Sequence, residues 1–143
     1  MDIRGFRGKY SFLSNFYSTP VHALVIYNGH AYYNTEAAFQ AQKCPERMCE
    51  FVSLNPSEAK HLGRYVPLRS DWDEVKDGIM YEIVLAKFTQ NERLRNALLA
   101  TGDANLIETN NWGDRYWGED EEGNGENHLG KTLEKVRENL SKA

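Results

Sequence analysis

The chain has 143 residues, of which 41% are hydrophobic and 27% are charged, and its formal net charge is −4. These values fit one globular domain over residues 1–143 that is large enough to bury a core. The acidic excess argues against a protein that binds nucleic acid through bulk attraction to phosphates. No apolar run is long enough to cross a bilayer and no signal peptide opens the sequence, so we expect a cytoplasmic protein without membrane contact.

Cysteine and histidine usage gives no sign of a metal site. The two cysteines, Cys44 and Cys49, are too few for a disulfide scaffold, and their spacing fits no zinc motif. The four histidines are scattered along the chain, and no glycine-rich phosphate loop or Walker pattern occurs. We therefore expect reduced thiols, no metal and no cofactor.

The first third of the chain predicts a loop followed by a hairpin. Residues 6–17 are dense in aromatic residues but contain Ser-Asn, which predicts a loop with buried rings. Two β-prone runs, residues 21–26 and 31–33, then flank Asn28 and Gly29. Asn-Gly between two such runs is the strongest short signal for a β-hairpin.

Residues 32–43 predict a helix that begins at a cap on Asn34 or Thr35. Three polar residues share one face of this helix at i, i+4 and i+7, namely Glu36, Gln40 and Lys43. A carboxylate, an amide and an amine beside aromatic residues suggest one wall of a polar pocket. The structural alternative is a solvated stripe whose end charges complement the helix dipole.

Start and stop signals predict five further helices, over residues 46–52, 55–63, 71–88, 91–99 and 128–140. Asp71 and Glu74 predict a capping box at the start of the longest one, and Gly78 within it predicts a close approach by another element. A short strand is expected at residues 106–108. The sequence therefore predicts an α+β fold that is predominantly helical, with a small N-terminal β-hairpin.

The segment after that strand is a glycine-rich loop, residues 110–118, that contains Trp112 and Trp117. Such large rings either pack on the core or stack on a flat ligand. The acidic run at residues 119–122 predicts a solvated turn. Across the chain, carboxylates, lysines and arginines stand next to aromatic residues, which suits a ligand with a flat ring, a sugar and a phosphate.

Short motifs in a fixed order along nearly the whole chain resemble the NADAR, or YbiA-like, family. They are Phe12-Leu13-Ser14-Asn15-Phe16-Tyr17, Glu36-Ala37-Ala38-Phe39-Gln40-Ala41-Gln42-Lys43, Leu62-Gly63-Arg64, Arg69-x-Asp71-Trp72, Met80, Ala86-Lys87-Phe88, Leu99-x-Thr101-Gly102, Glu108, Asp114-x-x-Trp117-Gly118 and Asn127-x-Leu129-Gly130. The acidic run at residues 119–122 departs from the family pattern. The resemblance implies an N-glycosidase that hydrolyses a ribosyl–nitrogen bond, such as ADP-ribose on guanine or a phosphoribosylamino-pyrimidine of riboflavin biosynthesis.

The resemblance also implies a set of site residues. The implied catalytic residues are Glu36, Lys43 and Asp114, and the implied substrate-binding residues are Asn15, Phe16, Arg64, Trp72, Lys87 and Trp117. Arg64 and Lys87 are expected to bind phosphate. Glu36 is expected to act as general acid/base in two alternative routes: direct hydrolysis aided by Asp114, or a transient Schiff base on Lys43.

Alternatives to this interpretation stay open at the level of sequence. The protein is expected to meet a ribosylated nucleobase or nucleotide-like small molecule, with an ADP-ribosylated nucleic acid and a toxin–antitoxin setting as further options. A different function class is a non-catalytic sensor that binds ADP-ribose or NAD. The structural alternatives are core packing for Trp72, an ion pair for Arg64 and a surface position at a helix end for Lys87.

Overall fold

The computed structural model describes residues 1–18 and 24–142 of the chain. The helices of this part are the 3₁₀ helices η1 (Gly8–Leu13) and η2 (Pro45–Phe51) and the α-helices α1 (Thr35–Ala41), α2 (Pro56–Leu62), α3 (Trp72–Gln90), α4 (Glu92–Ala100) and α5 (His128–Ser141). The strands are β1 (Asp2–Arg4), β2 (Val25–Tyr27), β3 (His30–Tyr32) and β4 (Asn105–Ile107). None of the described helices is both long and apolar enough to span a bilayer.

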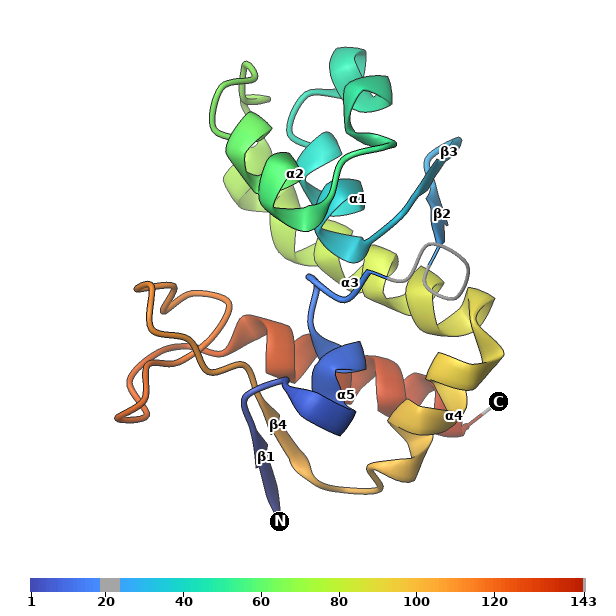
Figure 1. Ribbon diagram of the computed structural model, residues 1–143, viewed down its shortest axis with the longest axis vertical. Helices are drawn as coiled ribbons and strands as arrows, with labels where there is room; N and C mark the ends of the chain where they lie inside the picture. The colour runs from blue at the N-terminus through green and yellow to red at the C-terminus, as the bar shows by residue number, and fades with distance from the viewer. Residues whose placement is uncertain (19–23, 143) are drawn as a thin grey trace.

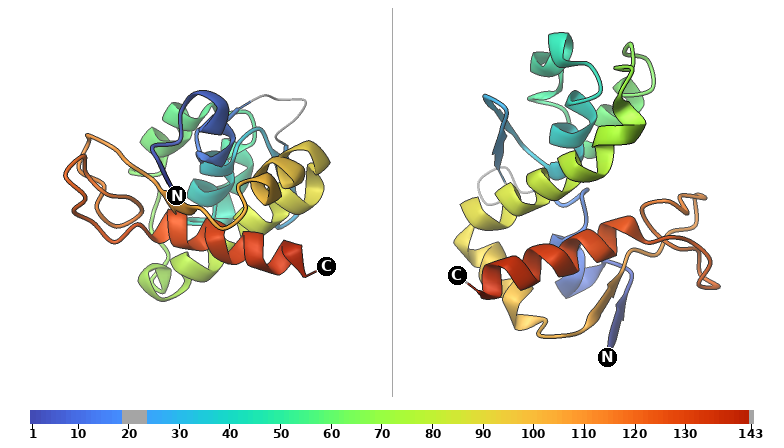
Figure 2. Two further views of the ribbon diagram at one scale, coloured as in Figure 1. Left: turned by 90° about the horizontal axis from the view of Figure 1, so that it is seen from below. Right: turned by 180° about the vertical axis from the view of Figure 1, so that it is seen from behind.

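The long helix α3 runs through the middle of the molecule (Figure 1). Helices α1 and α2 and the β2–β3 hairpin lie on one side of it, and α5, η1 and the β1–β4 pair lie on the other (Figures 1 and 2). The loop between β4 and α5 extends from one end of the second group (Figure 2). This predominantly helical α+β arrangement confirms the predicted fold class.

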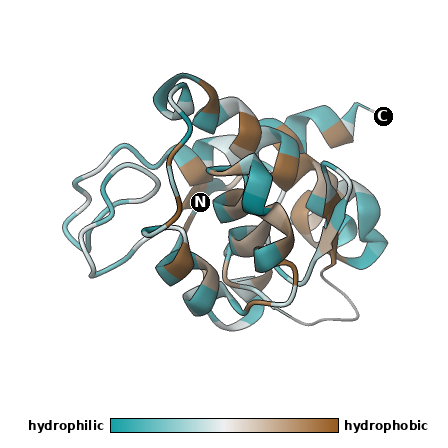
Figure 3. Ribbon diagram, turned by 90° about the horizontal axis from the view of Figure 1, so that it is seen from above, coloured by the Kyte–Doolittle hydropathy of each residue, from teal (hydrophilic) through white to brown (hydrophobic). Residues whose placement is uncertain are grey.

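The core forms where α3 packs between these two groups, and apolar and polar residues alternate along the helices (Figure 3). Met80, Ile83 and Phe88 of α3 are almost fully buried, as are Leu133 and Val136 of α5. Burial of a side chain of this size stabilises a fold by about 1.5–3 kcal/mol.

Two short strand pairs complete the fold. Strands β2 and β3 form the predicted hairpin, and Asn28 and Gly29 adopt positive φ angles of 52° and 86°, as a tight hairpin turn requires. The first part of the predicted strand, residues 21–23, lies outside the described residues. Strand β1 pairs in parallel with β4, at Asp2↔Asn105 and the two following pairs. The strand at β1 was not predicted.

The starts of α1 and α2 match the sequence signals. The Asn34 side chain accepts a hydrogen bond of 2.7 Å from the backbone N–H of Ala37 and so caps α1. Asn55 and Glu58 form a reciprocal capping box at α2, which ends at Gly63. A Cβ atom at Gly63 would lie 2.8 Å from Cδ of Gln40, so α1 and α2 approach closely at this glycine.

Two local predictions were wrong, and a third was correct only in part. Asp71 makes no side-chain cap at α3, because its carboxylate accepts hydrogen bonds of 2.6 and 3.1 Å from Arg69. Gly78 has open space around it rather than a neighbouring element. The helix expected at residues 46–52 is a 3₁₀ helix, kinked at Arg47, where the backbone leaves helical geometry.

Candidate active site

A cavity of about 210 Å³ opens where α1, α2, α3, α5 and two loops meet. Its lining residues are Ser14, Asn15, Phe16, Glu36, Phe39, Gln40, Lys60, Met80, Glu108, Trp112, Asp114, Trp117 and Leu129. Five of the nine site residues expected from the sequence are among them, namely Asn15, Phe16, Glu36, Asp114 and Trp117. Segments that are far apart in the sequence therefore converge on one site.

Glu36 is the most deeply placed acid of this cavity, with 8% of its surface exposed. Its backbone N–H donates to the Asn15 carbonyl at 3.0 Å, and its carboxylate accepts a 2.7 Å hydrogen bond from the Gln40 amide. Burial raises the pKa of Glu36, an effect that the Gln40 hydrogen bond and the positive charges of Lys60 and Lys43 oppose. A carboxyl group with a raised pKa keeps its proton to higher pH and can deliver it to a ligand.

Lys60 of α2 supplies the amine that lines the cavity. Its Nζ atom lies 5.9 Å from the centre of the Phe16 ring and 5.4 Å from the centre of the Trp112 ring. Phe16 and Trp112 are 41% and 59% exposed, so the ammonium stands next to two rings that a ligand can reach. Sequence reasoning missed Lys60, because its place at the cavity depends on how α2 packs against α1.

The loop between β4 and α5 contributes Asp114 and Trp117. The Asp114 carboxylate accepts hydrogen bonds from the backbone N–H groups of Tyr116 and Trp117 at 3.2 and 3.0 Å, which folds the loop into a tight turn. The Trp117 ring meets the Phe39 ring edge-on at 5.4 Å and thereby closes one side of the cavity. The loop is thus attached to α1, and its acid is held beside the cavity.

A second, outer pocket of about 350 Å³ adjoins this cavity. Its lining residues are Phe16, Ser57, Lys60, His61, Arg64 and Trp112, three of which also line the inner cavity. Arg64, expected from the sequence to bind phosphate, lies in this outer pocket and not in the inner one. An arginine, a lysine and a serine hydroxyl around one pocket suit an anionic group.

Lys43 does not line the cavity, contrary to the expectation from its spacing. Helix α1 ends at Ala41, and the backbone N–H of Lys43 bonds to the carbonyl of Gln40, so the chain turns more tightly than an α-helix. Lys43 Nζ lies instead 5.9 Å from the centre of the Trp72 ring. Burial lowers the pKa of Lys43, and the negative charge of Glu36 opposes that shift.

Trp72 and Lys87 also lie outside the lining of both pockets. Trp72 packs in the core 5.0 Å from the Phe39 ring. Lys87 is buried, and its Nζ donates hydrogen bonds of 2.6 and 3.1 Å to the carbonyls of Phe12 and Ser14. Burial lowers the pKa of Lys87 to about 7. Lys87 therefore fixes the turn that presents Asn15 and Phe16.

Potential metal ligands are dispersed over the part of the chain that the structure describes. No group of three or more His, Cys, Asp and Glu side chains there is placed to hold an ion. Both cysteines are free, Cys44 buried and Cys49 exposed. Lys60, Trp112 and Glu108 line the cavity but are not among the nine expected site residues, although Trp112 was considered as a stacking ring and Glu108 belongs to the motifs of the resemblance.

This fold and cavity define a small α+β protein with an acid-lined pocket and an adjoining cationic pocket. The family model of the NADAR domain matches residues 5–141. The chain therefore belongs to the NADAR family, which confirms the resemblance seen in its motifs.

Characterised relatives agree with this membership. The N-glycosidase YbiA of Escherichia coli is 38% identical over 138 residues, which cover 92% of this chain and 82% of that protein. An N-glycosidase of Nostoc punctiforme is 47% identical over 91 residues, covering 62% of this chain and 58% of that protein. A riboflavin biosynthesis protein of Vibrio vulnificus is 36% identical over 92% of this chain, which spans only 36% of that longer protein.

A solved structure shares the fold. The NMR structure of the E. coli protein YbiA superposes with a TM-score of 0.82 at 34% sequence identity, covering 99% of this chain and 87% of the other. The predicted compact YbiA-like fold is thereby confirmed.

Proposed function

We propose that the chain is an N-glycosidase that hydrolyses the bond between a ribosyl C1 atom and a nitrogen. The observation that carries this proposal is the convergence of Glu36, Asp114 and Lys60 on one cavity, with Glu36 almost fully buried. The relatives named N-glycosidase support the same class of reaction.

Cleavage of a ribosyl C–N bond needs a proton on the leaving nitrogen, negative charge near C1 and a deprotonated water. Glu36 supplies the proton, because its raised pKa favours the acid form. The C–N electron pair leaves with the nitrogen, and the Asp114 carboxylate stabilises the positive charge that develops at C1. A water molecule then bonds to C1 and transfers its proton to a carboxylate.

A second route uses an amine. The ribosylamine opens to an imine at C1, a lysine amine replaces the base nitrogen there, and water hydrolyses the lysine imine to free the sugar. The lining of the cavity favours Lys60 over Lys43 for this role. Borohydride reduction during turnover, followed by peptide mass spectrometry, is expected to label Lys60 if this route operates. Label on Lys43 would mean that Lys43 forms the Schiff base, and the absence of label would favour direct hydrolysis.

The outer pocket indicates a substrate that carries phosphate. In direct hydrolysis Arg64 and Lys60 pair with the phosphate, and in the amine route Arg64 pairs with it alone. Phe16 and Trp112 stack on a flat ring. Both ADP-ribose on guanine and a phosphoribosylamino-pyrimidine have these parts, and the riboflavin-related relative supports the second. An ADP-ribosylated nucleic acid, a partner toxin and a cytoplasmic location stay predictions from the sequence.

The test offers ADP-ribosylated guanosine and a phosphoribosylamino-pyrimidine to the wild type and to Glu36→Gln, with chromatographic detection of the released base. We expect turnover of at least one substrate by the wild type, and a loss of about 10²-fold or more in Glu36→Gln. Glu92→Gln, an exposed acid in the first turn of α4, is the matched control and keeps wild-type rates. Tight ADP-ribose binding without any product would favour the sensor.

A further inference from the structure

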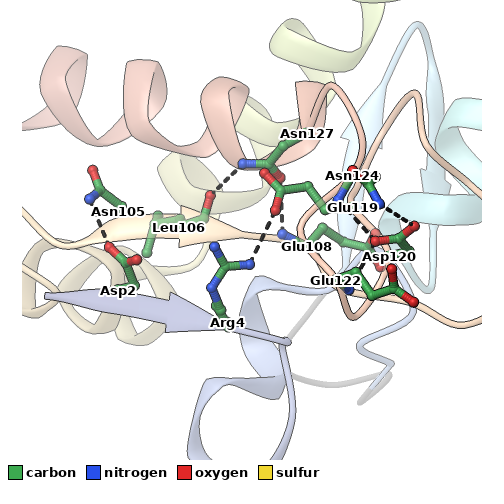
Figure 4. A network of polar contacts seen from close by, with 10 residues as sticks. All are labelled: Asp2, Arg4, Asn105, Leu106, Glu108, Glu119, Asp120, Glu122, Asn124 and Asn127. Carbon is green, nitrogen blue, oxygen red and sulfur yellow. Dashed lines mark hydrogen bonds and ion pairs between the residues drawn. The ribbon is translucent and has the colours of Figure 1, made fainter.

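Glu108 is an acid of the inner cavity that the proposed reaction does not use. It follows β4, and its main chain is fixed on both sides (Figure 4). Its N–H donates to the side-chain oxygen of Asn127 at 3.0 Å, and its carbonyl accepts a 2.7 Å hydrogen bond from the N–H of Glu119. These two hydrogen bonds restrain the backbone of Glu108 and so fix the position of its Cα atom at the cavity wall.

The carboxylate itself is also held. Its Oε2 atom accepts a 2.8 Å hydrogen bond from the amide of Asn110, which is buried and also binds both the N–H and the carbonyl of Asp114. A Cβ atom at position 118 would overlap this oxygen, so only a glycine lets the loop pack against Glu108. Among the described residues, no donor binds the other oxygen, Oε1. One acceptor atom of a fixed carboxylate is thus free for a ligand.

The chemistry around the cavity indicates which ligand group fits that acceptor. The inner walls carry polar groups beside apolar side chains, whereas the exposed rings stand at the junction with the outer pocket. The polar groups are Asn15, Glu36, Gln40 and Asp114, and the apolar ones are Phe39, Met80, Trp117 and Leu129. A polyhydroxylated sugar suits polar walls, and a flat base suits exposed rings. Sugar hydroxyls are hydrogen-bond donors, and a carboxylate oxygen is a strong acceptor for them.

We propose that Glu108 binds the 2-hydroxyl of the substrate ribosyl group through its free carboxylate oxygen and so selects ribosyl over 2-deoxyribosyl ligands. This inference rests on the proposed function, because it takes a ribosyl group as the occupant of the inner cavity. The 2-hydroxyl is bonded to the carbon next to C1, so an acid that shares the cavity with Glu36 is suited to reach it. A hydrogen bond at this hydroxyl strengthens as positive charge develops on the ring, which also aids cleavage.

The experiment measures the binding of ribose 5-phosphate and of 2-deoxyribose 5-phosphate by calorimetry. Burial raises the pKa of Glu108, so binding is measured at several values between about pH 6 and pH 9, because the ionised carboxylate is the stronger acceptor. We expect the wild type to prefer ribose 5-phosphate by about tenfold or more, and Glu108→Gln to lose that preference. The glutamine retains an oxygen for the Asn110 hydrogen bond, so the fold is kept, and a thermal melt verifies this.

Glu119→Gln is the matched control, because Glu119 lies in the same loop and pairs with Arg4 at 3.1 Å but does not line the cavity. It is expected to keep the wild-type preference. An equal affinity of the wild type for both sugars, no binding of either, or an unchanged preference in Glu108→Gln would each overturn the inference. The binding measurement needs no turnover, so it can fail or succeed independently of the proposed function. If the protein prefers ribose 5-phosphate but hydrolyses neither substrate, the proposed function is wrong and the role of Glu108 is still supported.

Discussion

At the scale of single residues, Glu36 combines deep burial with a place on the cavity wall. Burial raises its pKa above the ordinary value of 4.5, so the acid form is lost only as the pH rises through that higher value. For a general acid, we predict that kcat/KM of the wild type declines with rising pH, around a midpoint above 4.5. Rates from about pH 4 to pH 9 check this. A profile that rises throughout the range would make Glu36 a base.

The positions of three lysines relative to the cavity could be predicted from the sequence to different extents. Lys43 has the right spacing from Glu36, but α1 ends before it, and that end depends on how the following residues turn. Lys87 has the right motif, but it lies on the buried face of α3. Lys60 reaches the cavity because α2 packs on α1 at Gly63, a contact between segments that no local pattern encodes.

At the scale of elements, the contact between α1 and α2 supports Glu36 through Gln40. A Cβ at Gly63 would overlap the Gln40 amide oxygen, so Gly63→Ala is predicted to displace the side chain that binds Glu36. We expect a loss of stability of about 1–3 kcal/mol and a fall in turnover of about tenfold or more. The control is Gly78→Ala in α3, where space is open and a gain of about 0.5–1 kcal/mol is expected. Denaturant unfolding and rates check both, and equal effects would contradict the prediction.

The elements that sequence predicted correctly are those whose signal is local. The cap at Asn34, the capping box at Asn55 and the Asn28-Gly29 turn each involve residues only a few positions apart. The β1–β4 pair was missed at β1, because it joins Asp2 to Asn105 and short strands gain their stability from packing. Asp71 failed as a cap because Arg69, two residues away, competes for its carboxylate. The candidate site depends both on contacts between residues a few positions apart and on contacts between distant segments. The sequence therefore predicted only part of the site.

At the scale of the whole molecule, the cavity depends on how the two sides of α3 are held together. The end of η1 and the turn after it connect the two sides: Lys87 of α3 donates to the carbonyls of Phe12 and Ser14, and the carbonyl of Asn15 accepts from the N–H of Glu36 at the start of α1. A buried ammonium without a carboxylate partner is costly, which is the physical cause of its lowered pKa. The stability of the site therefore depends on the protonation of Lys87, although Lys87 lines neither pocket.

This linkage predicts the pH dependence of global stability. The pKa of Lys87 is about 7 in the folded protein and near its ordinary value of 10.5 in the unfolded chain, so between these values the unfolded state binds more protons. The free energy of unfolding should then rise with pH above 7, by at most about 1.4 kcal/mol per pH unit from this group, and be unaffected by it below. Lys87→Met should lack that rise, while the exposed control Lys135→Met keeps it. Urea unfolding at several values between about pH 6 and pH 9 measures the difference, and equal slopes in wild type and Lys87→Met would mean that Lys87 stays charged throughout.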